Sequence, residues 1–294
     1  MESINLENKN LNIGHKLNKS PLRYPGGKTR ACKILDKIFN EYFHPSEYNI
    51  LLSPFFGGGS FEFYLQNKYK YKLIINDKFT PLYNFWKQIK NNKIELCNEL
   101  YKIENVSKEL FNQYRNTIMN LNNKILNQAI QYFIINRCSF SGSTLSGGFS
   151  KDSSINRFTK SSIQKIELLD FSNIDIYNLD FEIFINNYFT NTGNSTNTGN
   201  STNTFIFLDP PYYLEKKSKL YGKNGNMHLN FNHKLLYTII KNKKNWIITY
   251  NNCEYIKLLY KDYIILNSEW SYGMNKNKKS SEIIILSKLN NSSN

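Results

Sequence analysis

Short apolar runs recur along this chain, and their order constrains its fold more than any other feature. Most are four or five residues long, and stretches with helical spacing stand between several of them. The runs lie at 49–52, 72–76, 174–177, 205–208, 246–250, 263–266 and 283–286, with helical patterns at 232–241 and 253–259. This alternation predicts an α/β fold with a mostly parallel, doubly wound Rossmann-like sheet of about seven strands.

A long interruption separates the second run from the third. Residues 84–135 form an amphipathic helical pattern, and a Ser/Gly-rich stretch without any period follows at 139–154. We therefore divide the chain into a disordered tail (1–20), a sheet domain (21–87 and 173–290) and an inserted helical domain (88–172). Residues 191–204 repeat Asn-Thr-Gly-Asn-Ser-Thr, which predicts a low-complexity surface loop whose deletion costs little stability.

The charge balance favours a polyanionic partner. Lys and Arg number 38 against 23 Asp and Glu, a formal net charge of +15. Lysines gather at 216–219, 241–244 and 276–279, where a bound duplex could contact them. The alternative is compositional drift, because the chain is rich in Asn, Lys, Ile and Tyr, as AT-rich coding sequence produces.

Cysteine and histidine spacing predicts no metal site. The 4 cysteines are scattered without a Cys-x-x-Cys pair, and the 4 histidines lack ligand spacing. No apolar stretch approaches the ~20 residues of a membrane span, and the first residues are polar and Asn-rich. We expect reduced thiols, no membrane association, and a cytoplasmic location in a bacterium or, for a viral protein, in its host. The oligomeric state is left open.

The run at 205–208 ends in Asp209-Pro210-Pro211-Tyr212, a sequence suited to holding an exocyclic amine. Two prolines cannot extend a strand, so the turn is rigid and its carbonyls are fixed. The Asp209 carboxylate and the Pro210 carbonyl then offer two acceptors to a planar NH2 group, and Tyr212 offers a ring for stacking. The alternative is a plain proline turn after a core strand.

A glycine-rich stretch follows the first apolar run and opens a helical pattern. It reads Ser-Pro-Phe-Phe-Gly-Gly-Gly-Ser at 53–60, so a ligand could approach its backbone closely. The stretch fails the dinucleotide fingerprint, since Glu62 replaces the third glycine, and residues 22–29 fail the phosphate-loop pattern, since Leu22 replaces its first glycine. Asp77 ends the second run, where an acid can take both ribose hydroxyls. An ordinary turn aspartate is the alternative.

Together these segments resemble the Dam-like DNA adenine-N6 methyltransferases, the D12 class or alpha group. The resemblance rests on Arg-Tyr-Pro-Gly-Gly-Lys at 23–28, the glycine stretch with Asn76 and Asp77, Asn-Arg-x-Ser-Phe-Ser-Gly at 136–142, and Asp-Pro-Pro-Tyr at 209–212, in this order. It implies S-adenosylmethionine as the cofactor, S-adenosylhomocysteine as the product, and double-stranded DNA as the partner. The sheet domain would bind the cofactor, and the inserted domain would recognise the target.

The resemblance also assigns roles by position. The motif at 23–28 would lie beside the methionine end of the cofactor, and the glycine stretch would surround the methionine moiety. Asp77 would bind the ribose, and Asp180 would accept from the cofactor's adenine amine. The cofactor-binding residues are then Tyr24, Lys28, Phe55, Gly57, Gly59, Asp77, Asp180 and Phe181. For Asp180, the alternative is a helix N-cap before residues 181–185.

The inserted loop is expected to contact DNA. Phe140 matches the residue that enters the duplex as a wedge, and the candidate contacts are Arg137, Phe140, Ser141, Gly142 and Arg157. GATC-specific members carry an aromatic-Asn-Gly core and a guanine-reading arginine soon after it, whereas the next arginine here is Arg157, which puts that specificity in doubt. Packing at the base of the loop is the alternative for Arg137. Residues 270–279 resemble a loop over the target site, with a solvated hairpin as the alternative.

The implied reaction is methyl transfer to N6 of an adenine flipped out of duplex DNA. Asp209 and the Pro210 carbonyl would accept both N6 hydrogens, and Tyr212 would stack on the base. The same acceptors suit RNA adenine N6 or cytosine N4, and an inactive DNA-binding relative is a further alternative. One setting for such an enzyme is a restriction-modification system with a cognate restriction endonuclease as partner, although the chain shows no sign of a nuclease.

Overall fold

A computed structural model describes residues 17–24, 26–120, 122–191, 203–213, 231–271 and 279–289. Its centre is one sheet of seven strands in the order β3-β2-β1-β4-β5-β7-β6. All neighbours pair in parallel except β7, which is antiparallel to both β5 and β6. The strands are β1 (Ile50–Ser53), β2 (Lys72–Asn76), β3 (Ile174–Tyr177), β4 (Thr204–Leu208), β5 (Trp246–Asn251), β6 (Tyr263–Ser271) and β7 (Lys279–Leu289). The predicted mostly parallel α/β sheet is confirmed.

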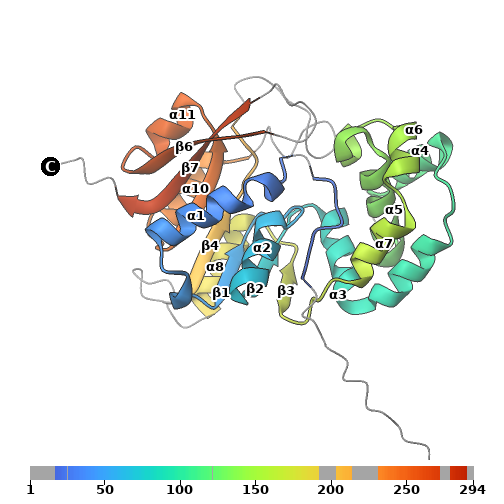
Figure 1. Cartoon of the computed structure of the whole chain (residues 1–294), viewed down its shortest axis with the longest axis horizontal. Coiled ribbons are helices and arrows are strands. Elements are labelled where there is room, and N and C mark those ends of the chain that lie inside the picture. Colours follow the sequence, from blue (N-terminus) through green and yellow to red (C-terminus); the bar gives the residue numbers. More distant parts are fainter. Residues whose placement is uncertain are drawn as a thin grey trace, which may run out of the picture.

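Helices cover both faces of the sheet (Figure 1). Successive residues of a strand point to opposite faces, so Phe205 and Phe207 join one buried cluster and Ile206 and Leu208 the other. The first cluster includes side chains of α1 (Cys32–Tyr42) and α2 (Ser60–Tyr69), and the second includes side chains of α8 (Phe181–Asn191), α10 (His233–Ile240) and α11 (Glu254–Leu259). Both faces of the central strands are therefore buried, as their continuous apolar runs require.

The insertion between β2 and β3 is helical, as predicted, and gathers at one end of the sheet (Figure 1). Its helices are α3 (Thr80–Tyr101), α4 (Lys108–Thr117), α5 (Ile125–Cys138), α6 (Lys151–Asn156) and α7 (Lys160–Glu167). The boundary drawn at 87/88 falls inside α3, which runs on to a kink at Asn92 with φ −141° and ψ 42°. Side chains of α4, α5 and α7 belong to the same buried cluster as α1 and α2, so the insertion shares the core of the sheet.

Two sequence expectations need correction. Residues 139–154 are not an irregular loop throughout, because they contain the 3₁₀ turns η3 (Phe140–Gly142) and η4 (Thr144–Ser146), a bridge between Ser139 and Phe149, and the start of α6. Short 3₁₀ turns leave no apolar period, which is why the pattern missed them. Helix α1 was also missed, although Cys32, Leu35 and Phe39 have helical spacing and are buried.

The parts of the chain near the predicted tail and low-complexity loop are only partly described. Residues 1–16 and 192–202 lie outside the described residues. Residues 17–20, which the sequence placed in the tail, are described, and Asn18 is buried there. Its side-chain amide donates to Gln66 Oε1 (2.8 Å) and to the Asp170 carbonyl (2.7 Å), which links α2 to the segment before β3. Two further 3₁₀ turns, η1 (Lys28–Arg30) and η2 (Pro45–Glu47), flank α1.

Candidate active site

The carboxyl ends of β1, β2 and β4 meet at one edge of the sheet, because these neighbours are parallel. The glycine stretch follows β1, Asp77 follows β2, and Asp209 follows β4. The backbone N–H of Gly57 donates to Asp77 Oδ2 at 2.9 Å, which joins the first two segments directly. The topology therefore brings together at one edge three segments that the sequence singled out separately.

Asp209 lies at the centre of a hydrogen-bond network. The ammonium group of Lys28, on η1, donates to both carboxylate oxygens of Asp209, at 2.7 Å to Oδ1 and 2.8 Å to Oδ2. Thr249 Oγ1, on β5, donates to Oδ1 at 2.6 Å. Lys28 is only 4% exposed, whereas the Asp209 side chain is 24% exposed. The carboxylate thus keeps a solvent-accessible side while its orientation is fixed from within.

Tyr212 and Glu282 extend this network. The Tyr212 hydroxyl donates to Glu282 Oε2 at 2.7 Å, and Lys28 Nζ lies 3.9 Å from the same oxygen and 5.1 Å from the centre of the Tyr212 ring. Burial raises the pKa of Glu282 to about 7, against the lowering effects of Lys28 and of the Tyr212 hydrogen bond. Burial and the carboxylates of Asp209 and Glu282 also hold the pKa of Tyr212 well above its usual value. We call Lys28, Asp209, Tyr212, Thr249 and Glu282 the Asp209 network.

A further buried carboxyl group, that of Glu62 on α2, lies next to the carboxyl end of β1. Glu62 Oε1 accepts a 2.7 Å hydrogen bond from Ser53 Oγ at the end of β1. Burial raises the pKa of Glu62 to about 8, although the Ser53 hydrogen bond lowers it. The sequence analysis noted Glu62 only as the residue that breaks the dinucleotide fingerprint, and it missed Thr249 and Glu282. A carboxylate at the head of the apolar run at 283–286 was the available signal for Glu282.

The glycine stretch is held in one conformation by aromatic side chains. Gly57 has φ +51°, and a Cβ there would lie 2.9 Å from the Tyr24 ring. At Gly59, with φ +67°, a Cβ would lie 2.3 Å from the Phe56 ring. Trp86 Nε1, from α3, donates to the Gly57 carbonyl at 3.0 Å. Only glycine fits at these two positions, and Tyr24 packs against the stretch as a neighbour.

Asp77 combines a turn role with an open binding capacity. Its Oδ1 accepts the Phe79 N–H at 2.9 Å, the bond expected of the turn alternative, while Oδ2 accepts the Gly57 N–H. Burial raises the pKa of Asp77 to about 6 against these two hydrogen bonds. Each carboxylate oxygen can accept more than one hydrogen bond, so the turn role leaves acceptors for a ligand.

Asp180 has the contacts of its helix-capping alternative. Its Oδ1 accepts the Glu182 N–H at 3.1 Å at the start of α8, and its Oδ2 pairs with Lys78 Nζ at 2.7 Å. Although partial burial opposes it, pairing with Lys78 and the Glu182 bond hold the pKa of Asp180 below its usual value. Phe181 lies 5.6 Å from Phe55 and 5.2 Å from Phe231 between ring centres. The predicted aromatic residues of the cofactor site therefore pack together, with Phe231 as an addition.

The predicted DNA-contacting residues divide into buried and exposed ones. Arg137 is buried, and its guanidinium donates to the carbonyls of Arg157 (2.6 Å) and Pro21 (3.1 Å), as the packing alternative requires. Burial and the nearby Arg23 and Arg157 lower the pKa of Arg137 to about 10. Arg157 itself is exposed, and Phe140 is 67% exposed at η3.

Residues 139–150, called here the 139–150 loop, are anchored to the segment that leads into the active site. The Asn136 side chain accepts the Arg23 N–H (2.9 Å) and donates to the carbonyls of Arg23 (2.7 Å) and Gly142 (3.3 Å). A Cβ at Gly142, where φ is +72°, would lie 2.4 Å from the Arg23 carbonyl oxygen. Ser141 is half-buried with φ 59°. The loop thus rests on Arg23, one residue before Tyr24.

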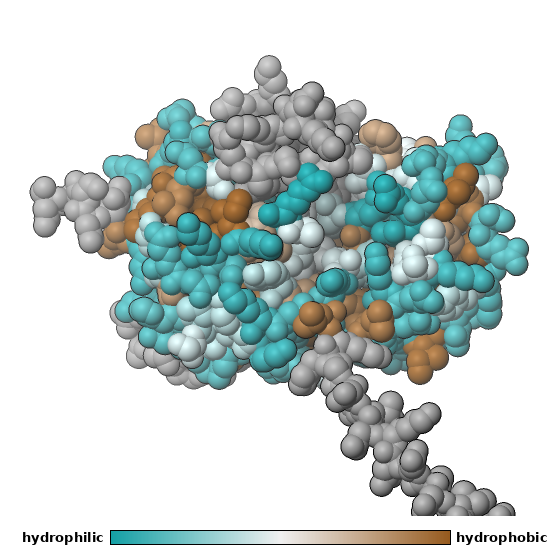
Figure 2. All heavy atoms as spheres, in the orientation of Figure 1, coloured by the Kyte–Doolittle hydropathy of each residue, from teal (hydrophilic) through white to brown (hydrophobic). Residues whose placement is uncertain are grey.

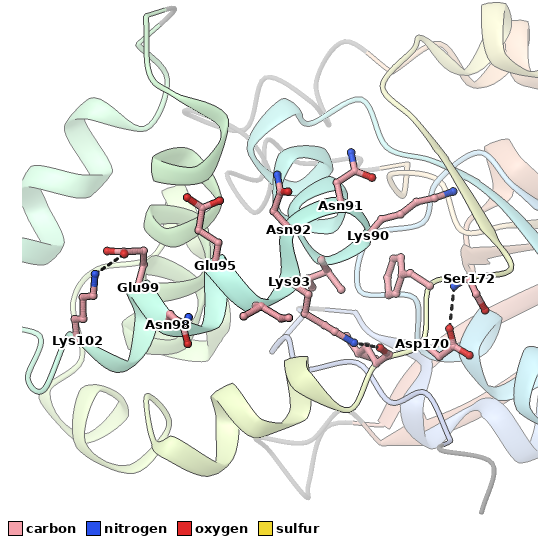
Figure 3. Close-up of a pocket in the computed structure, with 14 residues that line it drawn as sticks. Lys90, Asn91, Asn92, Lys93, Glu95, Asn98, Glu99, Lys102, Asp170 and Ser172 are labelled. Atoms are coloured by element: carbon pink, nitrogen blue, oxygen red, sulfur yellow. Dashed lines mark hydrogen bonds and ion pairs between the residues drawn. The ribbon is translucent and has the colours of Figure 1, made fainter. Parts of the chain in front are cut away.

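A groove on α3 lies away from this site. Lys90, Lys93, Asn98 and Lys102 line it together with residues 169–172, which precede β3 and so lie at the amino edge of the sheet (Figure 3). Lys93 Nζ donates to the Leu169 carbonyl at 2.6 Å. The groove contains none of the predicted site residues. In Figure 2 the visible face is mostly hydrophilic, with scattered apolar patches.

Several predictions concern segments of which the structure describes only a part. Within the described residues, no helix is long and apolar enough to cross a bilayer, and no group of three His, Cys, Asp or Glu side chains could hold a metal ion. The four cysteines are buried free thiols. Lys216, Lys217 and Lys219 lie outside the described residues, as do residues 272–278 of the segment expected over the target site.

Comparison with known families gives a match over most of the chain. The family model described as D12 class N6 adenine-specific DNA methyltransferase matches residues 24–274. This span includes the glycine stretch, Asp77, the insertion and Asp209. A comparison with curated proteins finds no match.

Proposed function

The chain belongs to the D12 class of N6 adenine-specific DNA methyltransferases, and from this premise we propose how its residues carry out the reaction. The enzyme methylates adenine N6 in DNA. In our proposal the methyl donor is S-adenosylmethionine, and the target adenine is flipped out of a short recognition sequence in duplex DNA. Asp209, Pro210 and Tyr212 hold the amine and its ring, and Pro211 keeps the turn rigid.

The observation that carries this proposal is the arrangement of hydrogen bonds on Asp209. Among the described residues, Oδ1 accepts from both Lys28 and Thr249, whereas Oδ2 accepts from Lys28. Oδ2 therefore has more free acceptor capacity on a side chain that is 24% exposed. One N6 hydrogen would bond to Oδ2 and the other to the Pro210 carbonyl. As N6 gains positive charge during transfer, the fixed carboxylate stabilises it.

The ammonium group of Lys28 donates to the Asp209 carboxylate from its buried side. These bonds show that the Asp209 carboxylate is oriented to receive N–H donors. An incoming N6 must share Asp209 with Lys28, so in this account Lys28 holds the carboxylate in place and screens its charge before the base arrives. The sequence assigned Lys28 to the cofactor, and we now propose that it acts mainly on Asp209.

The cofactor site that we propose lies beside Asp209 at the same edge of the sheet. When bound, S-adenosylmethionine supplies an electrophilic methyl group on a sulfonium, and transfer leaves S-adenosylhomocysteine. The residues fit this group, because Asp77 retains acceptors for ribose hydroxyls and the glycine stretch exposes backbone without side chains. Phe55 and Phe181 would contact the adenine, with Phe231 beside them. Tyr24, Gly57 and Gly59 shape the methionine end, and Asp180 would bind the cofactor's adenine amine while it also accepts from Lys78 and the Glu182 N–H.

For DNA, we propose that the 139–150 loop enters the duplex. The exposed ring of Phe140 is a suitable wedge to fill the space of a flipped base, and Ser141 and Gly142 place it. Arg157 is exposed and can contact phosphate or guanine, whereas Arg137 is buried and donates to the carbonyls of Pro21 and Arg157. The net charge of +15 favours the phosphate contacts. We further propose that the enzyme acts in the cytoplasm as the protective half of a restriction-modification system.

A labelling experiment tests this function. The purified protein is incubated with tritiated S-adenosylmethionine and unmethylated genomic DNA, and the DNA is then sequenced for modified bases. The proposal predicts label at N6 of adenine within one short sequence. Label in RNA alone, label at cytosine N4, or DNA binding without label would reject it.

A further inference from the structure

The hydroxyl group of Tyr212 has a role that ring stacking does not require. A stacked base contacts the face of the ring, so phenylalanine would serve equally well for stacking. Here the hydroxyl donates a 2.7 Å hydrogen bond to Glu282 Oε2. This bond joins the turn after β4 to β7, a strand about seventy residues further along the chain. The ring of Tyr212 is therefore fixed from its far end.

Glu282 is itself held firmly. Strand β7 lies between β5 and β6, and Glu282 is paired with Asn251 on one side and Ser268 on the other. The residue is 1% exposed. A strand with ladder hydrogen bonds on both sides has little freedom to move, so the carboxyl group is a fixed reference point. The four residues that follow it, Ile283 to Leu286, are all buried and apolar.

Burial of the Glu282 carboxyl group is costly, so its polar contacts matter. A buried carboxyl group is unfavourable unless it is paired and hydrogen-bonded, and an apolar side chain would continue the run at 283–286. Its partners include two members of the Asp209 network, namely the Tyr212 hydroxyl and, at 3.9 Å, the ammonium group of Lys28. Those partners are the groups that face the proposed target base, which relates Glu282 to the reaction.

We propose that Glu282 is a positioning residue for methyl transfer. It fixes the Tyr212 ring through the phenol hydroxyl, so that the target adenine is stacked with N6 directed at Asp209. This inference rests on the proposed function and adds to it a residue on the antiparallel strand. Glu282 acts through Tyr212 and does not touch the substrate. Correct placement of a reacting group is worth large factors in rate, so the loss should appear in kcat.

A double-mutant cycle tests the link between the two side chains. Glu282→Ala should lower kcat for transfer to DNA about ten- to hundredfold, because a hydrogen bond between a hydroxyl and a charged group is lost. Tyr212→Phe should lower kcat by a similar factor. In the Tyr212→Phe background, Glu282→Ala should change kcat by less than about threefold, since the bond is already gone. Full additivity of the two losses would overturn the inference.

A conservative variant separates positioning from charge. Glu282→Gln keeps an oxygen that can accept from the Tyr212 hydroxyl but removes the negative charge beside Lys28. Positioning predicts a kcat within about threefold of wild type, with cofactor affinity and melting temperature unchanged. A loss as large as that of Glu282→Ala would contradict it. If the wild-type enzyme transfers no methyl group to DNA, the proposed function fails first and this inference with it.

Discussion

The Asp209 network and the 139–150 loop are built in opposite ways, although both rest on the segment from Arg23 to Lys28. In the network, side chains from η1, from the turn after β4, and from β5 and β7 meet, and each polar contact joins elements that are distant in sequence. In the loop, backbone turns are held by the buried Asn136 amide and by the guanidinium groups of Arg23 and Arg115, and the Phe140 side chain is exposed. The network can hold a reacting group in place, whereas the loop can present an exposed side chain to a bound partner. We infer that chemistry belongs to the first region and target engagement to the second.

Removing the central carboxylate gives the largest expected difference between the two regions. Asp209→Ala should lower the transfer rate at least about a thousandfold, because the acceptor for N6 is lost. Affinity for the cofactor and for DNA should change less than about threefold, as the glycine stretch and the loop are intact. Single-turnover kinetics and titration calorimetry measure these quantities. Asp175→Ala, at a partly exposed carboxylate on β3 outside the network, is the matched control. A variant that methylates at nearly the wild-type rate would show that Asp209 has another role.

Removing the amide that anchors the loop should mainly reduce stability. Asn136→Ala deletes three hydrogen bonds to Arg23 and Gly142 in a fully buried position. We expect a loss of about 2–4 kcal/mol in the free energy of unfolding, since several buried backbone groups lose partners. Urea denaturation measures it. Asn156→Ala, an exposed amide on α6, should change stability by less than about 0.5 kcal/mol. Equal effects of the two variants would argue against an anchoring role.

Truncating the exposed ring should affect DNA and leave the fold unchanged. Phe140→Ala should lower kcat/KM for duplex DNA about ten- to hundredfold, because the flipped state loses its wedge. Its melting temperature should stay at the wild-type value, since the side chain is 67% exposed. Ile155→Ala, 63% exposed on α6, is the matched apolar control and should have no effect on transfer. A drop in melting temperature for Phe140→Ala would mean that the ring packs in the fold.

The buried carboxyl groups should make stability depend on pH. Burial raises the pKa of Glu62 from 4.5 to about 8, so the folded state binds this proton more tightly than the unfolded state. The stabilising contribution of protonated Glu62 to the free energy of unfolding is therefore complete below pH 4.5, and it is lost as the pH rises towards about 8. Glu62→Gln should flatten the fall in unfolding free energy over this interval by up to about 1 kcal/mol per pH unit. Thermal melts of both proteins at several pH values measure this dependence. If the unfolding free energy of Glu62→Gln falls with pH as steeply as that of the wild type, Glu62 is not the group that loses the proton.

The sequence predicted the sheet and its insertion well, because the buried strands are continuous apolar runs. It also singled out Asp209, Asp77 and the glycine stretch, since each is a local motif at the end of a strand, and the structure brings these segments to one edge of the sheet. Thr249 gave no such signal, and Glu282 gave only that of a carboxylate at the head of an apolar run. Thr249 reaches the network through the pairing of β4 with β5, and Glu282 through the pairing of β5 with β7, and neither register can be found from a local motif.

The loop shows a different limit of prediction. Its turns depend on positive φ angles at Ser141 and Gly142 and on backbone contacts with Arg23, none of which leaves a periodic pattern. Arg137 looked like a DNA contact or a packing residue, and only its burial among carbonyl groups favours the second. Sequence reasoning identified the loop by resemblance, and the structure adds which side chains point outward.

The most direct test of this division compares two variants on two DNA substrates. Transfer rates of Asp209→Ala and Phe140→Ala are measured on a duplex with the target adenine paired, and on the same duplex with an abasic site opposite it. An unpaired adenine costs less to flip, so the defect of Phe140→Ala should largely disappear on the second duplex. The defect of Asp209→Ala should remain, because it concerns the transfer step. Rescue of Asp209→Ala by the abasic site, or an unchanged defect of Phe140→Ala, would contradict the account.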